Sequence, residues 1–162
     1  MRRVARQATF LPPAALVRLP FRMQLQETEV NRLLTLVACM AVLTWLLLML
    51  ASLIRVKGWT LPGILRAFGN RDHLPEPTAF AGRADRTARN TLEAMVLFTA
   101  VAFVVHASGT TNPLALTGAE VFFWARLAYI PVYYLGIPFL RTTVWTVGIG
   151  GLGTMLVAAW SP

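Results

Sequence analysis

The chain has 162 residues, of which 56% are hydrophobic and only 14% are charged. An ordinary soluble domain has roughly 25% charged residues, so this composition excludes an ordinary soluble domain. It indicates a single integral membrane domain. The net charge of +8 would suggest a nucleic-acid partner in a soluble protein. Here the basic residues are concentrated before Met23 and between Arg55 and Arg89. We therefore assign them to membrane surfaces and expect the lipid bilayer, not nucleic acid, as a partner.

Four mostly apolar stretches have about the length of one bilayer crossing, which takes roughly 20 helical residues. We place the spans at about 31–54, 88–107, 121–140 and 142–160. No strand-forming alternation competes with them. The sequence therefore predicts an all-α integral membrane protein with a bundle of four transmembrane helices.

Residues 1–28 are predicted to form a basic tail before a membrane domain at 29–162. Four spans with a cytoplasmic first connection put this tail outside, where the positive-inside rule disfavours basic residues. One hypothesis is that translation begins at Met23, because residues 23–29 are acidic. A cleaved targeting segment and a genuine basic arm are the alternatives.

The first span is uniformly apolar and holds the single cysteine, Cys39. One cysteine excludes an intramolecular disulfide and any cysteine-cluster metal site. The connection over 55–83 is rich in Gly, Pro and basic residues, which is typical of a loop at a membrane surface. Its part 61–68 is compatible with an interfacial turn of helix. By the positive-inside rule this connection faces the cytoplasm.

The second span opens on Arg86, Asn90 and Glu93, which share one helical stripe at i, i+4 and i+7. A carboxylate in hydrocarbon costs at least about 2 kcal/mol unless it is paired or faces a polar cavity. The stripe is therefore interpreted as a functional site. His106, near the other end of this span, has no Cys or carboxylate at ligand spacing, so we predict no metal site.

The third span carries Arg126, Tyr129 and Tyr133 on one stripe. Arg126 is interpreted as an ion-pair partner of Glu93 that holds the two spans together, which does not exclude a role in positioning a ligand. The tyrosines alone would suit an interfacial aromatic belt. Arg141 begins the fourth span, where it would ordinarily be a snorkelling end-cap.

The polar groups of the last three spans gather at one membrane level. Together they offer cations for carboxylates and an amide and a carboxylate for an amine, which suits a small zwitterionic peptide. Within the fourth span, the segment 148–153 has the G-x-G-x-x-G spacing of a dinucleotide loop. Because it lies in an apolar span with no preceding strand, we interpret it as close helix packing.

The pattern Arg83-x-x-Arg86-x-x-x-Asn90-x-x-Glu93 resembles the second-helix signature of the MAPEG family, the membrane-associated proteins in eicosanoid and glutathione metabolism. The pattern Arg126-x-x-Tyr129-x-x-x-Tyr133, followed by Arg141, is similar to the third helix and the start of the fourth. The resemblance covers about 29–160. It implies a homotrimer of four-helix subunits that holds glutathione, as co-substrate, between subunits near the cytoplasmic face.

The resemblance also implies roles for single residues. Arg141 would be catalytic by stabilising the glutathione thiolate, and Arg126 is counted with the binding residues. Ala94 stands where several eicosanoid-pathway members have an aromatic residue. This compact chain is more similar to the bacterial branch, which implies the inner membrane of a bacterium. The residues implied to contact glutathione are Arg86, Asn90, Glu93, Tyr129 and Tyr133.

The expected function is a glutathione-dependent transferase or peroxidase that activates the thiolate toward a lipophilic electrophile from the bilayer. One alternative is a non-catalytic membrane scaffold that keeps the polar cluster to hold its helices together. Another is a small transporter, since charges inside a membrane also mark permeation paths.

Overall fold

The computed structural model of the chain describes residues 21–70, 74 and 76–161, with side chains from Glu29 onward in the first helix. The described residues form five helices and no strand, which confirms the all-helical class. Residues 1–20 of the predicted tail lie outside the described residues, whereas 21–28 belong to the first helix. The start at Met23 stays a prediction. The helices are α1 (Phe21–Val56), α2 (Leu61–Phe68), α3 (Ala79–Ser108), α4 (Leu114–Leu135) and α5 (Pro138–Trp160).

Three of the described helices are long and apolar enough to cross a membrane, over Glu29–Val56, Ala79–Ser108 and Pro138–Trp160. The fourth predicted span corresponds to α4, which is not among them. Its 22 residues include Glu120 and Arg126, and these charges lower its hydropathy. Length and composition therefore identify three candidate spans where the sequence predicts four.

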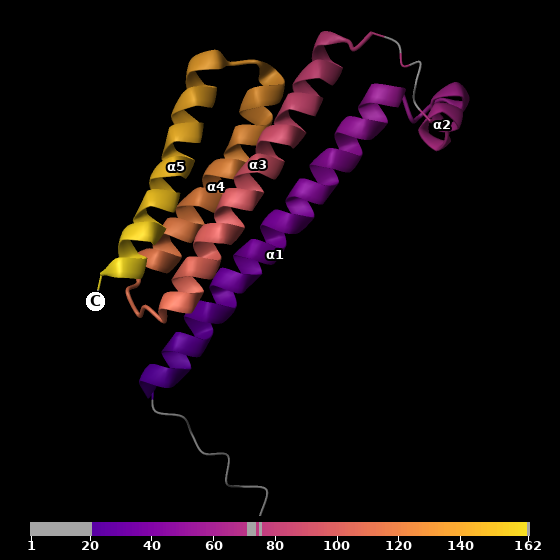
Figure 1. The fold of residues 1–162 in the computed structure, drawn as a ribbon. Coiled ribbons are helices and arrows are strands. Elements are labelled where there is room, and N and C mark those ends of the chain that lie inside the picture. Colours follow the sequence, from indigo (N-terminus) through magenta and orange to yellow (C-terminus); the bar gives the residue numbers. More distant parts are fainter. Residues whose placement is uncertain (1–20, 71–73, 75, 162) are drawn as a thin grey trace, which may run out of the picture.

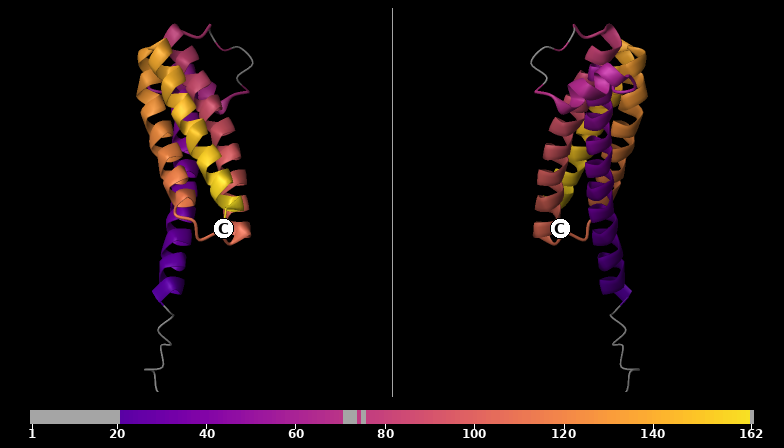
Figure 2. Two further views of the ribbon diagram at one scale, coloured as in Figure 1. Left: turned by 90° about the vertical axis from the view of Figure 1, so that its left-hand side faces the viewer. Right: turned by 90° about the vertical axis from the view of Figure 1, so that its right-hand side faces the viewer.

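The four long helices lie side by side, with α1 against α3, α4 against α5, and α3 in contact with both α4 and α5 (Figure 1). Helix α2, the last turn of α1 and the turn between α4 and α5 lie at one end of the molecule. We call this the α2 end. The connection between α3 and α4 lies at the opposite end with the C-terminus, and α1 extends beyond its neighbours there (Figures 1 and 2).

Local signals set the helix limits. The Thr78 side chain accepts a hydrogen bond from the Ala81 backbone N–H, which satisfies one of the free donors at the start of α3. Gly136 ends α4 in the left-handed conformation with φ 77°, which suits a residue without Cβ. Pro138 then stands at the start of α5, where its missing N–H costs nothing. The sequence had predicted that Arg141 begins the fourth span. It lies instead in the first turn of α5, three residues after Pro138.

Glycines allow α4 and α5 to approach at backbone distance. A Cβ added to Gly151 would lie 2.7 Å from the carbonyl oxygen of Gly118, and one added to Gly118 would lie 2.6 Å from that of Gly151. A Cβ added to Gly148 would be in ordinary contact with α4, but at Gly150 and Gly153 it would meet no described atom within 4 Å. The packing interpretation of the glycine motif is therefore confirmed for Gly148 and Gly151.

The core lies where α1 and α3 meet the α4–α5 pair. The rings of Phe98 and Phe122 stack with centroids 4.6 Å apart, and Met40 and Met155 are fully buried around them. This packing fixes the lengthwise register of α3 against α4. That register decides which polar side chains of the two helices meet.

Candidate functional site

Arg126 of α4 is buried, with 3% of its surface exposed, and it bonds to the polar stripe of α3. Its Nη1 donates a hydrogen bond of 2.8 Å to Asn90 Oδ1. The guanidinium carbon lies 5.5 Å from the ring centroid of Phe122 and 5.3 Å from that of Tyr129. The predicted ion pair with Glu93 is not formed among the described residues. Arg126 bonds instead to Asn90, which lies one helical turn before Glu93.

Tyr133 joins three helices at the α2 end. Its hydroxyl accepts a hydrogen bond of 3.2 Å from Arg86 Nε of α3. The guanidinium carbon of Arg141, from α5, lies 5.1 Å from the centre of the Tyr133 ring. The Tyr129 ring follows with its centroid 5.4 Å from that of Tyr133. The alternative of an interfacial aromatic belt is wrong for both tyrosines, because only 4% of Tyr129 and 9% of Tyr133 are exposed.

The contacts form one network, which we call the polar network. It runs from Asn90 through Arg126, Tyr129 and Tyr133 to Arg86 and Arg141. The structure thus brings together six of the seven residues predicted for the site. The seventh, Glu93, lies one turn beyond Asn90 on α3.

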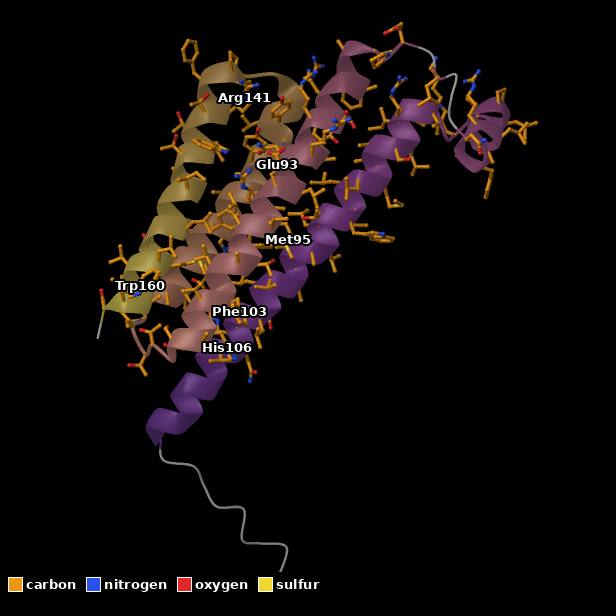
Figure 3. All side chains as sticks on the ribbon, in the orientation of Figure 1. Glu93, Met95, Phe103, His106, Arg141 and Trp160 are labelled. Atoms are coloured by element: carbon orange, nitrogen blue, oxygen red, sulfur yellow. The ribbon has the colours of Figure 1, made fainter. Side chains whose placement is uncertain are left out.

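Glu93 is exposed near the middle of α3, and its carboxylate makes no hydrogen bond or ion pair with any residue that the structure describes. Figure 3 shows Glu93 and Arg141 in the same half of the molecule, with His106 and Trp160 toward the opposite end. A carboxylate at this depth of a membrane-spanning helix is unfavourable when it faces hydrocarbon. Among the described residues, Arg126 attracts this carboxylate electrostatically but forms no ion pair with it.

Two contacts at this site were not predicted. Arg83 Nε donates a hydrogen bond of 3.1 Å to the backbone carbonyl of Tyr134 in the last turn of α4, and the Phe80 ring packs on the Tyr134 ring at 5.4 Å. The last four carbonyls of a helix have no partner within it, so a donor from a neighbour was to be expected there. The position of Arg83, one turn before Arg86, was the available signal.

Two hollows among the described residues lie away from the polar network. A partly open hollow of about 80 Å³ lies at the end of the molecule opposite the α2 end, and its lining includes Glu29, His106 and Asn112. A shallower, mostly apolar groove of about 500 Å³ runs along α4 and α5. Neither is lined by a residue of the polar network. The exposed side chains Arg86 and Arg141 form an open patch, which needs a second surface to enclose a ligand.

A model of the MAPEG family matches residues 33–161, which is most of the chain and includes the whole polar network. The chain belongs to the MAPEG family. MAPEG proteins are membrane proteins of glutathione and eicosanoid metabolism, which agrees with the three apolar helices and associates this member with a lipid bilayer. No curated protein matches this chain. The recognition based on the patterns of the second and third spans is confirmed.

Proposed function

We propose that this MAPEG protein binds glutathione at the polar network and acts as a glutathione-dependent transferase or peroxidase. The observation that carries the proposal is the convergence of Arg86 and Arg141 on Tyr133, with the carboxylate of Glu93 two turns beyond Arg86 on the same helix. Glutathione carries two carboxylates, one ammonium group and one thiol. Two exposed cations and one exposed carboxylate complement these charges, and charge-assisted hydrogen bonds are the stronger kind.

The residues have separate roles in this proposal. Arg86 binds a glutathione carboxylate, and Glu93 binds the ammonium group. Asn90 accepts from Arg126 through its oxygen, so its NH₂ group stays available to the peptide. Arg126 acts as a positioning residue that holds Asn90, while Tyr129 and Tyr133 bound the site.

Arg141 is proposed to stabilise the thiolate. A free thiol has a pKa of about 8.5, and the thiolate is the nucleophile. A fixed guanidinium beside the sulfur favours the anion, and each unit by which the pKa falls corresponds to about 1.4 kcal/mol. The electrophile is proposed to be lipophilic and to arrive from the bilayer.

The proposed assembly is a homotrimer with the site between subunits. All four long helices would then cross the membrane, α4 among them, because Arg126 is buried inside the subunit and Glu120 pairs with Arg32 of α1. A neighbouring subunit would cover the open patch and remove Glu93 from the lipid. The α2 end, which carries the basic connection, is proposed to face the cytoplasm of a bacterium.

Calorimetry with purified protein in lipid nanodiscs tests the proposal. Arg86→Ala is expected to weaken glutathione binding strongly. Arg89→Ala is the matched control, because Arg89 lies on the same helix, is 73% exposed at its side chain and pairs with Asp85 one turn away. If wild type does not bind glutathione, or if Arg86→Ala binds like wild type, the proposal fails.

The buried bond between Arg126 and Asn90 favours a second candidate, a non-catalytic scaffold in which the polar network only holds the helices together. This candidate predicts that Arg126→Met or Glu93→Gln disrupts assembly, with no ligand involved. The glutathione site predicts instead that Glu93→Gln assembles normally and loses affinity. Size measurements and calorimetry on the Glu93→Gln variant separate the two.

A further inference from the structure

The short helix α2 leaves a row of large apolar side chains uncovered. The exposed fractions are 72% for Leu61, 66% for Leu65 and 88% for Phe68, and Trp59 just before the helix is 70% exposed. Among the described elements, α2 contacts only α1. It projects beside the end of α1, on the side away from α5 (Figures 1 and 2).

The position of α2 is fixed by direct contact with the end of α1. Gly63 is buried there, and a Cβ at this position would clash with the backbone carbonyl oxygen of Lys57. The Thr60 hydroxyl accepts a hydrogen bond of 3.1 Å from Gly63 N–H and donates one of 2.9 Å to the same Lys57 carbonyl. The apolar row therefore has a defined direction relative to the membrane helices.

The apolar residues of α2 share one face. Leu61, Ile64, Leu65 and Phe68 follow the i, i+3, i+4, i+7 spacing of a helical stripe. Arg66 lies on the opposite side of the helix and is exposed. The helix is thus amphipathic, with one apolar and one basic side over a length of about 12 Å.

The location of this face identifies its partner. The apolar stretch of α1 ends at Val56, and α2 begins five residues later at Leu61. The helix therefore lies at the level where hydrocarbon gives way to lipid headgroups. Tryptophan is enriched at that level, and basic side chains there attract anionic headgroups. Trp59, Lys57 and Arg66 supply both features.

We propose that α2 lies in the surface of the bilayer that the chain crosses, with its apolar face in the boundary between acyl chains and headgroups. Lys57 and Arg66 contact anionic lipid headgroups. A second copy of the chain is a less suitable partner, because its α2 carries the same basic charge. This inference does not depend on the binding of glutathione.

Fluorophore labelling at single cysteines tests the inference. Replacing the only cysteine by Cys39→Ser gives a background in which Phe68→Cys reports the apolar face and Arg66→Cys, the matched control, reports the opposite face. Each variant is labelled with an environment-sensitive fluorophore and reconstituted in vesicles containing lipid with a quencher on the upper part of its acyl chain. We expect at least threefold stronger quenching at position 68 than at position 66. We also expect quenching at position 68, in the variant that keeps Lys57 and Arg66, to grow when anionic phosphatidylglycerol replaces neutral phosphatidylcholine.

Equal quenching by the lipid at positions 66 and 68 would overturn the inference. So would stronger quenching by aqueous iodide at position 68 than at position 66. Crosslinking between copies through position 68 would also overturn it, since a second subunit would then cover this face. Leu65→Cys reads the same face in case the loss of Phe68 disturbs α2. Size and thermal unfolding, compared with the Cys39→Ser parent, show which variants remain folded.

Discussion

The close approach of α4 and α5 leads to a prediction about two neighbouring glycines, Gly150 and Gly151. A Cβ at Gly151 would lie 2.7 Å from the carbonyl oxygen of Gly118 and 2.9 Å from the backbone nitrogen of Phe122. Both atoms belong to the backbone of α4, so no side chain can rotate away. Gly151→Ala therefore requires the two helices to separate. A Cβ at Gly150 would meet no described atom within 4 Å.

The magnitudes follow from two opposing effects. Replacing glycine by alanine inside a helix favours the helix by up to about 1 kcal/mol. Overpacking a closely packed contact costs about 1–3 kcal/mol, and a clash with rigid backbone belongs at the upper end of that range. Gly151→Ala is thus expected to lower the free energy of unfolding by about 1–2 kcal/mol. Gly150→Ala is expected to raise it by up to about 1 kcal/mol.

Denaturant-induced unfolding of the purified protein in mild detergent measures both changes. The same helix pair holds Arg141 over the Tyr133 ring, so Gly151→Ala should also weaken glutathione binding while Gly150→Ala should not. If the two variants shift stability equally, or if Gly151→Ala is the more stable, then α4 and α5 do not meet at Gly118 and Gly151.

Further predictions concern the polar network. Tyr133→Phe keeps the ring and removes the hydroxyl that accepts from Arg86, so calorimetry should give about tenfold weaker glutathione binding. Tyr134→Phe is the control and should bind glutathione normally, since the buried Tyr134 hydroxyl has no described partner. Asn90→Ala leaves the buried Arg126 guanidinium without its acceptor and should lower the free energy of unfolding by about 1.5–3 kcal/mol. Asn90→Asp keeps an acceptor and should lower it by less. In the wild type, ultraviolet absorbance should detect the thiolate of bound glutathione at pH values below the ordinary thiol pKa of about 8.5. Arg141→Gln should raise the pKa of the bound thiol. An unchanged titration in this variant contradicts the role of Arg141.

Much of the polar network follows from helical periodicity. The i, i+4 spacing places Arg86 with Asn90, and Tyr129 with Tyr133, each pair on one face of its helix. Short connections make α3, α4 and α5 antiparallel neighbours, so the polar ends of these helices meet at one level. These relations depend on spacing and connection length, and the sequence therefore predicted that the polar groups of the last three spans gather at one level, although not that Arg141 contacts Tyr133.

The choice of partners could not be predicted in the same way. Asn90 and Glu93 are separated by about 4.5 Å along α3, so a small lengthwise shift of α4 decides which of them Arg126 meets. That shift is set by the stacking of Phe98 on Phe122, which hydropathy does not reveal. The start of α5 at Pro138 was missed for a similar reason, because an apolar stretch does not show where a helix begins.

The burial of Arg126 changes what Glu93 requires. Because the guanidinium lies between two aromatic rings and bonds to Asn90, it does not form an ion pair with the neighbouring carboxylate. Glu93 then needs a cation from a ligand or from another subunit, since facing lipid is costly. The two sources predict different behaviour. If a subunit supplies the cation, Glu93→Gln weakens the assembly without glutathione, but if the glutathione ammonium supplies it, Glu93→Gln leaves the assembly intact and reduces affinity alone. We infer the second, because Arg86 and Arg141 at the same site already provide the cations that the carboxylates of the peptide require.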